Sequence, residues 1–192
     1  LLYAVLATAV LSAALFIFQD PVMKGLFTAF LALSIMYSTP PIRFKARPGF
    51  DSLSNILYGM PGFLGYYQAS GDLPSLMIVV AVALWTAAMH LYSSIPDISF
   101  DKEAGLRTTS VLLGKEKSLF LCLLLWSLSA VIIGWYDIIL GFLGVVYPIL
   151  VLLLLSGKII KKDVSRFYWY FPYINTAIGF ILFWYPVGQV LL

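Results

Sequence analysis

Apolar and polar stretches alternate along this chain. Predominantly apolar runs recur seven times between short polar connectors, and each has about the 17 to 25 residues that an α-helix needs to cross a bilayer. None of the runs shows the period-two alternation of a β-barrel. The pattern therefore predicts an all-α, polytopic membrane helix bundle with seven transmembrane helices, at residues 1–18, 22–39, 53–69, 74–95, 118–136, 138–156 and 167–191.

The composition supports this interpretation. Of the 192 residues, 61% are hydrophobic and 11% are charged, whereas about a quarter of a soluble domain is charged. The net charge of +3 comes from basic residues in short loops that form no extended stripe, so no nucleic-acid partner is expected. The single cysteine, Cys122, cannot form an intrachain disulfide and is expected to be a buried filler. Residues 1–192 are expected to form one membrane domain.

The basic residues are distributed unevenly among the connectors. Lys24 is the only one of the twelve on one side of the predicted bundle. The loops at 40–52, 96–117 and 157–166 hold the others, so the positive-inside rule places these three loops in the cytoplasm. Leu1 then starts inside and Leu192 ends outside. The basic residues of the three loops are Arg43, Lys45, Arg47, Lys102, Arg107, Lys115, Lys117, Lys158, Lys161, Lys162 and Arg166.

The stretch richest in candidate chemistry is residues 90–114, HLYSSIPDISFDKEAGLRTTSVLLG. A helix continued through it from residue 86 places Thr86, His90, Ser93 or Ser94, Asp97 and Asp101 on one face. The two aspartates are neighbours at i and i+4 and repel each other unless a cation lies between them. The spacing therefore predicts a metal site at Asp97 and Asp101.

Other polar groups fall at the same predicted cytoplasmic level. Paired prolines end the second apolar segment and favour an extended Thr39 before the basic loop. The third segment carries Asn55 and three glycines, which indicate either close helix packing or a broken helix beside a cavity. The last segment is crowded with aromatic residues, which indicate an interface belt, core packing or the wall of a pocket.

These groups together match what a diphosphate requires. Magnesium held by carboxylates bridges to phosphate oxygens, and nearby basic side chains neutralise the remaining charge. A diphosphate that enters from lipid is most simply attached to a polyprenyl chain, whose allylic C–O bond ionises when the leaving group is stabilised. Magnesium is thus expected at Asp97 and Asp101. The diphosphate is expected at Arg43, Lys45, Arg107 and Asn55, and the substrate pocket at Tyr37, Tyr58, His90, Ser94 and Asn175.

The run PDISFDKEAGLRTTSVLLG resembles the second aspartate-rich motif of the UbiA-type intramembrane prenyltransferases, with Asp97 and Asp101 as its DxxxD. YSTPPIRFK is similar to that family's segment after its fourth helix. The resemblance implies that Asp97 and Asp101 bind magnesium and prenyl diphosphate and that Arg43 and Lys45 bind diphosphate. Some members have a tyrosine followed four residues later by lysine; here Pro41 stands four residues after Tyr37.

The family fold has nine transmembrane helices and a first aspartate motif in the cytoplasmic loop after the second helix. The resemblance therefore implies a chain that begins at the third helix, is N-terminally incomplete and is inactive by itself. Its cavity is expected to be open on the side of the first and last segments, where small residues such as Ala4, Ala7 and Gly179 would otherwise meet neighbours.

The acceptor and the rival functions remain alternatives. The segments HLYSSIPDI and YWYFPYIN…GFILFWY are similar to the lycopene elongase branch, which implies a carotenoid acceptor; a quinone-type acceptor is the alternative within the family. A membrane transporter or channel module, a CDP-alcohol phosphotransferase and a purely structural subunit are the rivals outside it. The paired DG and AR signature of the phosphotransferases is absent. The expected location is a prokaryotic cell membrane, with the site facing the cytoplasm.

The predicted topology can be tested by cysteine labelling in intact cells. In a Cys122→Ala background, Lys45→Cys should react only after the membrane is permeabilised, whereas Asp72→Cys should react from outside, because the basic loops stay in the cytoplasm. Labelling of both positions from the same side would contradict this topology.

Overall fold

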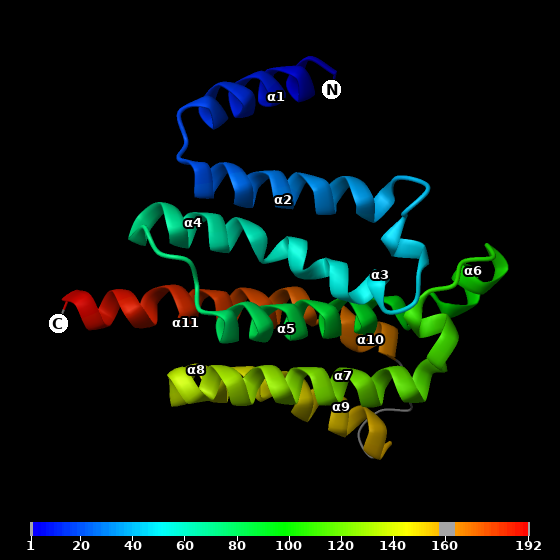
Figure 1. The fold of residues 1–192 in the computed structure, drawn as a ribbon. Coiled ribbons are helices and arrows are strands. Elements are labelled where there is room, and N and C mark those ends of the chain that lie inside the picture. The colour runs from blue at the N-terminus through cyan, green and yellow to red at the C-terminus, as the bar shows by residue number, and fades with distance from the viewer. Residues whose placement is uncertain (1, 158–163, 192) are drawn as a thin grey trace.

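The computed structural model describes residues 2–157 and 164–191, with side chains up to residue 185; Lys158, Lys161 and Lys162 of the third basic loop lie outside the described residues. The described chain is helical and contains no strand (Figure 1), which confirms the predicted all-α membrane helix bundle. Its elements are α1 (Leu2–Ile17), α2 (Pro21–Ser38), η1 (Phe44–Ala46), α3 (Phe50–Leu53), η2 (Ser54–Tyr58), α4 (Met60–Ser70), α5 (Leu76–Ser94), α6 (Ile98–Glu103), α7 (Thr109–Tyr136), α8 (Ile138–Gly144), α9 (Val146–Ser156), α10 (Val164–Tyr168) and α11 (Phe171–Leu191).

Among the residues that the structure describes, four helical segments are long and apolar enough to cross a bilayer: Pro21–Ser38, Leu76–Ser94, Thr109–Tyr136 and Ile138–Ser156. Helix α1 is a shorter apolar helix. The number of spans, seven in our prediction, stays a prediction. Several helices pack closely against each other: α2 against α4, α5 against α3, η2 and α7, and α7 against α8 and α9.

The third segment is a broken helix, one of the two alternatives expected for it: η2 ends at Tyr58 and α4 begins at Met60, with Gly59 between them and Pro61 in the first turn of α4. Two local predictions were wrong. The helix from Thr86 does not continue to Asp101, since α5 ends at Ser94 before Pro96 and α6 starts at Ile98. The helix expected at 118–136 already begins at residue 109, with a kink at 114.

Short polar side chains start the membrane helices. The Asp20 carboxylate accepts from the amides of Val22 and Met23 at 2.8 and 3.1 Å, and the Met23 bond in particular lowers the pKa of the Asp20 carboxyl. Asp137 caps α8 in the same way, and the Ser75 hydroxyl accepts from the Ile78 amide of α5. These bonds satisfy amides that a helix start otherwise leaves unpaired in lipid.

The core is a cluster of aromatic rings between α5, α7, α9 and α11. Trp126, Tyr92, Tyr147 and Phe171 are each at most 2% exposed. Trp126 is stacked on Tyr147 with ring centroids 5.2 Å apart, and Tyr92 lies 4.7 Å from Phe171. Cys122 is fully buried beside this cluster, which confirms its predicted role as a filler. Aromatic packing therefore holds the beginning of α11 against the bundle.

Helix α1 lies at the edge of the bundle (Figure 1), and none of its described residues is buried. Ala4 and Ala7, expected on an open surface, are exposed on it, and Gly179 is exposed on α11. These faces have no described neighbour that covers them.

Helices α7 and α8 approach each other through two glycines. A Cβ added at Gly141 would overlap Gly134 Cα and lie 2.9 Å from the Gly134 nitrogen. Gly141→Ala should therefore lower the free energy of unfolding by about 1–3 kcal/mol, measured by denaturant titration in detergent.

Gly62→Ala is the matched control, since a Cβ at residue 62 meets nothing within 4 Å. It should leave the stability unchanged or slightly higher. Equal stability of the two variants would contradict the close approach.

Candidate functional site

A buried carboxylate joins the first polar loop to the start of α7. Asp51 is fully buried, and its carboxylate accepts hydrogen bonds from the Thr109 amide at 2.7 Å, from the Thr109 hydroxyl and from the Ser52 amide at 2.9 Å. The Gly49 amide donates to the same Thr109 hydroxyl at 2.7 Å. Asp51 of α3 and Gly49, which directly precedes α3, are thus both bonded to Thr109, the first residue of α7. About sixty residues separate them from Thr109 in sequence.

The two neighbours of Thr109, which are Thr108 and Ser110, bond α6 and the end of α5. Thr108 donates to the Asp101 carboxylate at 3.3 Å and lies 3.2 Å from the hydroxyl of Ser110. Ser110 in turn donates to the Ser94 carbonyl at the end of α5, at 3.2 Å. The run Thr108–Ser110 therefore ties together α3, α5, α6 and α7 at one end of the bundle.

Helices α3 and α6, which this network bonds to the start of α7, lie toward the same end of the bundle (Figure 1). Asp97 precedes α6, and the Asp101 amide donates to the Asp97 carbonyl at 2.8 Å, so the two aspartates are one helical turn apart. Asp97 is exposed and Asp101 is half-buried. Arg43 and Lys45, at η1, and Arg107, directly before the α7 cap, are all exposed.

Arg43 has an unusual backbone. Its φ of 42° and ψ of 63° are left-handed, and it is the only non-glycine residue with positive φ in the described part of the chain. Its amide donates to the Thr39 carbonyl at 3.0 Å, and Thr39 is extended as predicted. Such a conformation is uncommon outside glycine, so the loop holds Arg43 in a specific orientation.

A polar cavity of about 300 Å³ lies next to this end of the bundle. Asn55, Tyr58, His90 and Asn175, predicted for the diphosphate or the substrate pocket, all line it. The Asn55 amide also donates to the Asp51 carbonyl, which links the cavity wall to the buried carboxylate. The remaining lining residues are Trp85, Thr86, Met89, Ser93 and Tyr168.

Several predicted pocket residues lie elsewhere. Ser94 is buried against α7, with its hydroxyl bonded to the Leu91 carbonyl, and its neighbour Ser93 lines the cavity instead. Tyr37 is half-buried in the last turn of α2, outside the cavity lining. Ser93 and Ser94 both lie in the last turn of α5, on different sides of the helix: Ser93 lines the cavity, whereas the Ser94 carbonyl accepts from Ser110 of α7.

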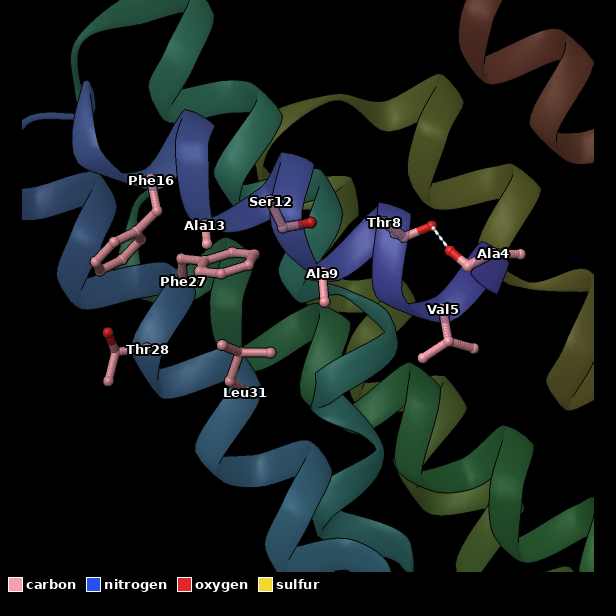
Figure 2. A pocket seen from close by; sticks show the side chains of 10 residues that line it. All are labelled: Ala4, Val5, Thr8, Ala9, Ser12, Ala13, Phe16, Phe27, Thr28 and Leu31. Carbon is pink, nitrogen blue, oxygen red and sulfur yellow. Dashed lines mark hydrogen bonds between the residues drawn. The ribbon is translucent and has the colours of Figure 1, made fainter. Parts of the chain in front are cut away.

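A further cavity is not part of this site. It measures about 670 Å³ and lies between α1 and α2, where small side chains of α1 face Phe27 and Leu31 (Figure 2). Its lining contains no charged residue, and its drawn hydrogen bond runs from the Thr8 hydroxyl to the Ala4 carbonyl at 2.9 Å. It is a mainly apolar groove between the two helices.

Sequence reasoning missed three residues that organise the site. The sequence patterns assigned no role to Asp51, Thr108 or Thr109. A Thr-Thr-Ser run before an apolar helix does carry an N-cap signal. Nothing in the sequence pairs that cap with Asp51, since the contact joins positions 58 apart.

The structure is thus a helical membrane bundle that carries paired aspartates, exposed basic residues and a polar cavity at one end. The UbiA prenyltransferase family matches residues 1–166. The chain belongs to this family, which confirms the resemblance found in its motifs.

The chain is 40% identical over 178 residues to the lycopene elongase/hydratase of Haloferax volcanii, covering 93% of this chain and 58% of the relative. It is 40% identical over 153 residues to the same-named protein of Haloarcula japonica, covering 80% and 51%. A Corynebacterium glutamicum relative of that name is 30% identical over 123 residues, covering 62% and 42%. The chain thus spans about half the length of these relatives. No solved structure matches it.

The Asp51 clamp predicts a loss of stability on mutation. Asp51→Asn removes a charged acceptor that is bonded to three donors, so the free energy of unfolding should fall by about 2 kcal/mol, the scale of hydrogen bonds to charged groups. Thermal unfolding in detergent measures the change.

Asp72→Asn is the control, because Asp72 is exposed in the loop before α5. It should leave the melting temperature unchanged. An Asp51→Asn protein as stable as this control would rule out the clamp.

Proposed function

We propose that the protein containing this chain transfers a prenyl group from a prenyl diphosphate to a lipophilic acceptor, and that the acceptor is a carotenoid such as lycopene. The observation that carries the proposal is the convergence of the two polar loops on Thr108–Ser110. It brings the aspartate loop and the basic loop to one end of the bundle, beside a cavity lined by polar and aromatic side chains.

Magnesium fits the donor set. The described residues contain no group of three or more His, Cys, Asp or Glu side chains that could enclose a metal. Mg²⁺ does not require one, since it is usually held by one or two carboxylates, waters and the phosphates of its substrate. Asp97 and Asp101 would supply those carboxylates. Bound there, the ion would neutralise charge that builds up on the diphosphate.

The basic residues would act on the leaving group. Arg43, Lys45 and Arg107 would bind the diphosphate oxygens, Arg43 and Arg107 through planar guanidinium groups suited to phosphate. Their charge favours breakage of the allylic C–O bond, whose electron pair leaves with the diphosphate. Exposed positions at the end of the bundle keep these charges out of the hydrocarbon region, where they would be costly.

The cavity would shelter the prenyl cation. The faces of Tyr58, Trp85 and Tyr168 can stabilise a positive charge, as aromatic faces do for other cations. The cation would then form a C–C bond with a double bond of the acceptor. His90, the only histidine of the chain, lines the same cavity and would take the proton that the product loses.

The carotenoid acceptor rests on the relatives. Proteins named lycopene elongase/hydratase align with as much as 93% of the chain at 40% identity. The distribution of basic residues supports a site on the cytoplasmic side of the membrane, and the archaeal and bacterial sources of the relatives support a prokaryotic cell membrane.

Removing either carboxylate tests the proposal. In the full-length protein that contains this chain, Asp97→Asn and Asp101→Asn should each lower kcat/KM for prenyl transfer to lycopene roughly a hundredfold or more, because each loses a ligand charge without losing volume. Product formation is measured against magnesium concentration with lycopene, and with 4-hydroxybenzoate as the rival acceptor.

Glu103→Gln provides the control, since Glu103 is an exposed carboxylate on the same short helix. It should keep wild-type activity. Near-wild-type transfer by either aspartate variant would refute the assigned site, and prenylation of 4-hydroxybenzoate with lycopene untouched would refute the carotenoid acceptor.

A further inference from the structure

A second, apolar cavity of about 350 Å³ lies deeper in the bundle, which we call the inner chamber. One face of α11 lines it, since its residues there follow helical spacing: Asn175, Ile178, Gly179 and Leu182. Opposite this face lie Trp85 of α5, Trp126 of α7 and Tyr147 of α9. No charged residue lines the chamber.

The inner chamber adjoins the polar cavity. Trp85 and Asn175 line both. The Tyr147 hydroxyl donates to the Asn175 carbonyl oxygen at 2.7 Å, which fixes the side chain at this boundary. The two cavities therefore adjoin each other, and Trp85 and the hydrogen-bonded Asn175 lie at the boundary between them.

Together the two cavities are long. On α5 the chamber begins at Ala81, and the polar cavity ends at Ser93. Twelve residues of helix correspond to about 18 Å at 1.5 Å per residue. This is more than half of the roughly 30 Å hydrocarbon thickness of a bilayer. The space suits an extended molecule that lies along the helix axes.

The walls of the chamber suit a flat apolar chain. Trp126 and Tyr147 are stacked with an interplanar angle of 28°, and Trp85 meets Tyr147 edge-on at 5.4 Å. Trp126 is 1% exposed, so most of its ring is covered by protein.

We propose that the inner chamber binds the hydrocarbon chain of the acceptor, a rigid conjugated polyene whose reacting end reaches past Trp85 into the polar cavity. This inference rests on the proposed function and specifies where its acceptor lies. The stacked aromatic walls favour the flat, rigid polyene over the flexible chain of the donor, and the two occupants are distinguished by the KM measurements below.

The test narrows the chamber from α11 in the full-length protein reconstituted in vesicles. Gly179 lies in the middle of the lining face, and a Cβ added there meets nothing within 4 Å, so a larger side chain is accommodated without a clash at its base. Gly179→Leu should raise the KM for lycopene roughly tenfold while the KM for the prenyl diphosphate stays the same.

Ala177→Leu is the matched control, because Ala177 is exposed on α11 outside the lining face. It should behave as wild type. A raised KM for the diphosphate with an unchanged KM for lycopene would place the donor chain in the chamber and overturn the inference. No change in either KM would overturn it as well.

A binding measurement separates this inference from the proposed function. Lycopene should quench tryptophan fluorescence in the wild type, and the quenched amplitude should fall in Trp126→Phe but not in Trp135→Phe, since Trp135 is 82% exposed. Quenching that depends on Trp126, without prenyl transfer by the wild type, would keep the chamber and refute the function. If the wild type transfers the prenyl group but the quenching is the same in the Trp126 and Gly179 variants, the function would stand and the chamber as acceptor site would be refuted.

Discussion

The bond between Asp51 and the start of α7 is the interaction on which the rest of the site depends. A carboxylate that is fully buried in a membrane bundle is costly unless its lone pairs are bonded and its charge is compensated. Both conditions are met here, because Thr109 and Ser52 supply three donors and the N-terminus of a helix presents partial positive charge. Since the partners lie on α3 and α7, the charge is satisfied only when the two polar loops are docked together.

The membrane explains why this docking uses side-chain hydroxyls. Backbone groups that leave regular helices cannot be left unpaired in hydrocarbon, so broken segments survive there only where protein covers or bonds them. The break through α3, η2 and α4 meets that condition: Asn55 bonds the Asp51 carbonyl, and Ser54 bonds the Phe50 carbonyl at 2.5 Å. The same break places Asn55 and Tyr58 in the wall of the polar cavity, so one irregular segment serves both stability and the site.

Helix α5 connects the ends of the functional space. Its C-terminal half lines the polar cavity and its middle lines the inner chamber, while its packing against α7 is the most extensive in the bundle. Helix α11 is held by the Phe171 ring near its start, by Ile174 and Ile178 against the core and by the Tyr147–Asn175 bond. The two helices form opposite walls of the functional space.

The sequence by itself determined the helical membrane class, the filler role of Cys122 and the family, because hydropathy, composition and a local motif are properties of contiguous residues. It also indicated four residues of the polar cavity: Asn55, Tyr58, His90 and Asn175. It did not indicate the chamber walls, since Trp126 and Tyr147 sit in segments that look like featureless apolar scaffold. Only the tertiary structure decided the pairing of Asp51 with Thr109 and the exchange of Ser94 for Ser93. Both depend on how α7 packs, since Thr109 bonds Asp51 and Ser110 bonds the Ser94 carbonyl, and no local pattern encodes contacts between segments so far apart in sequence.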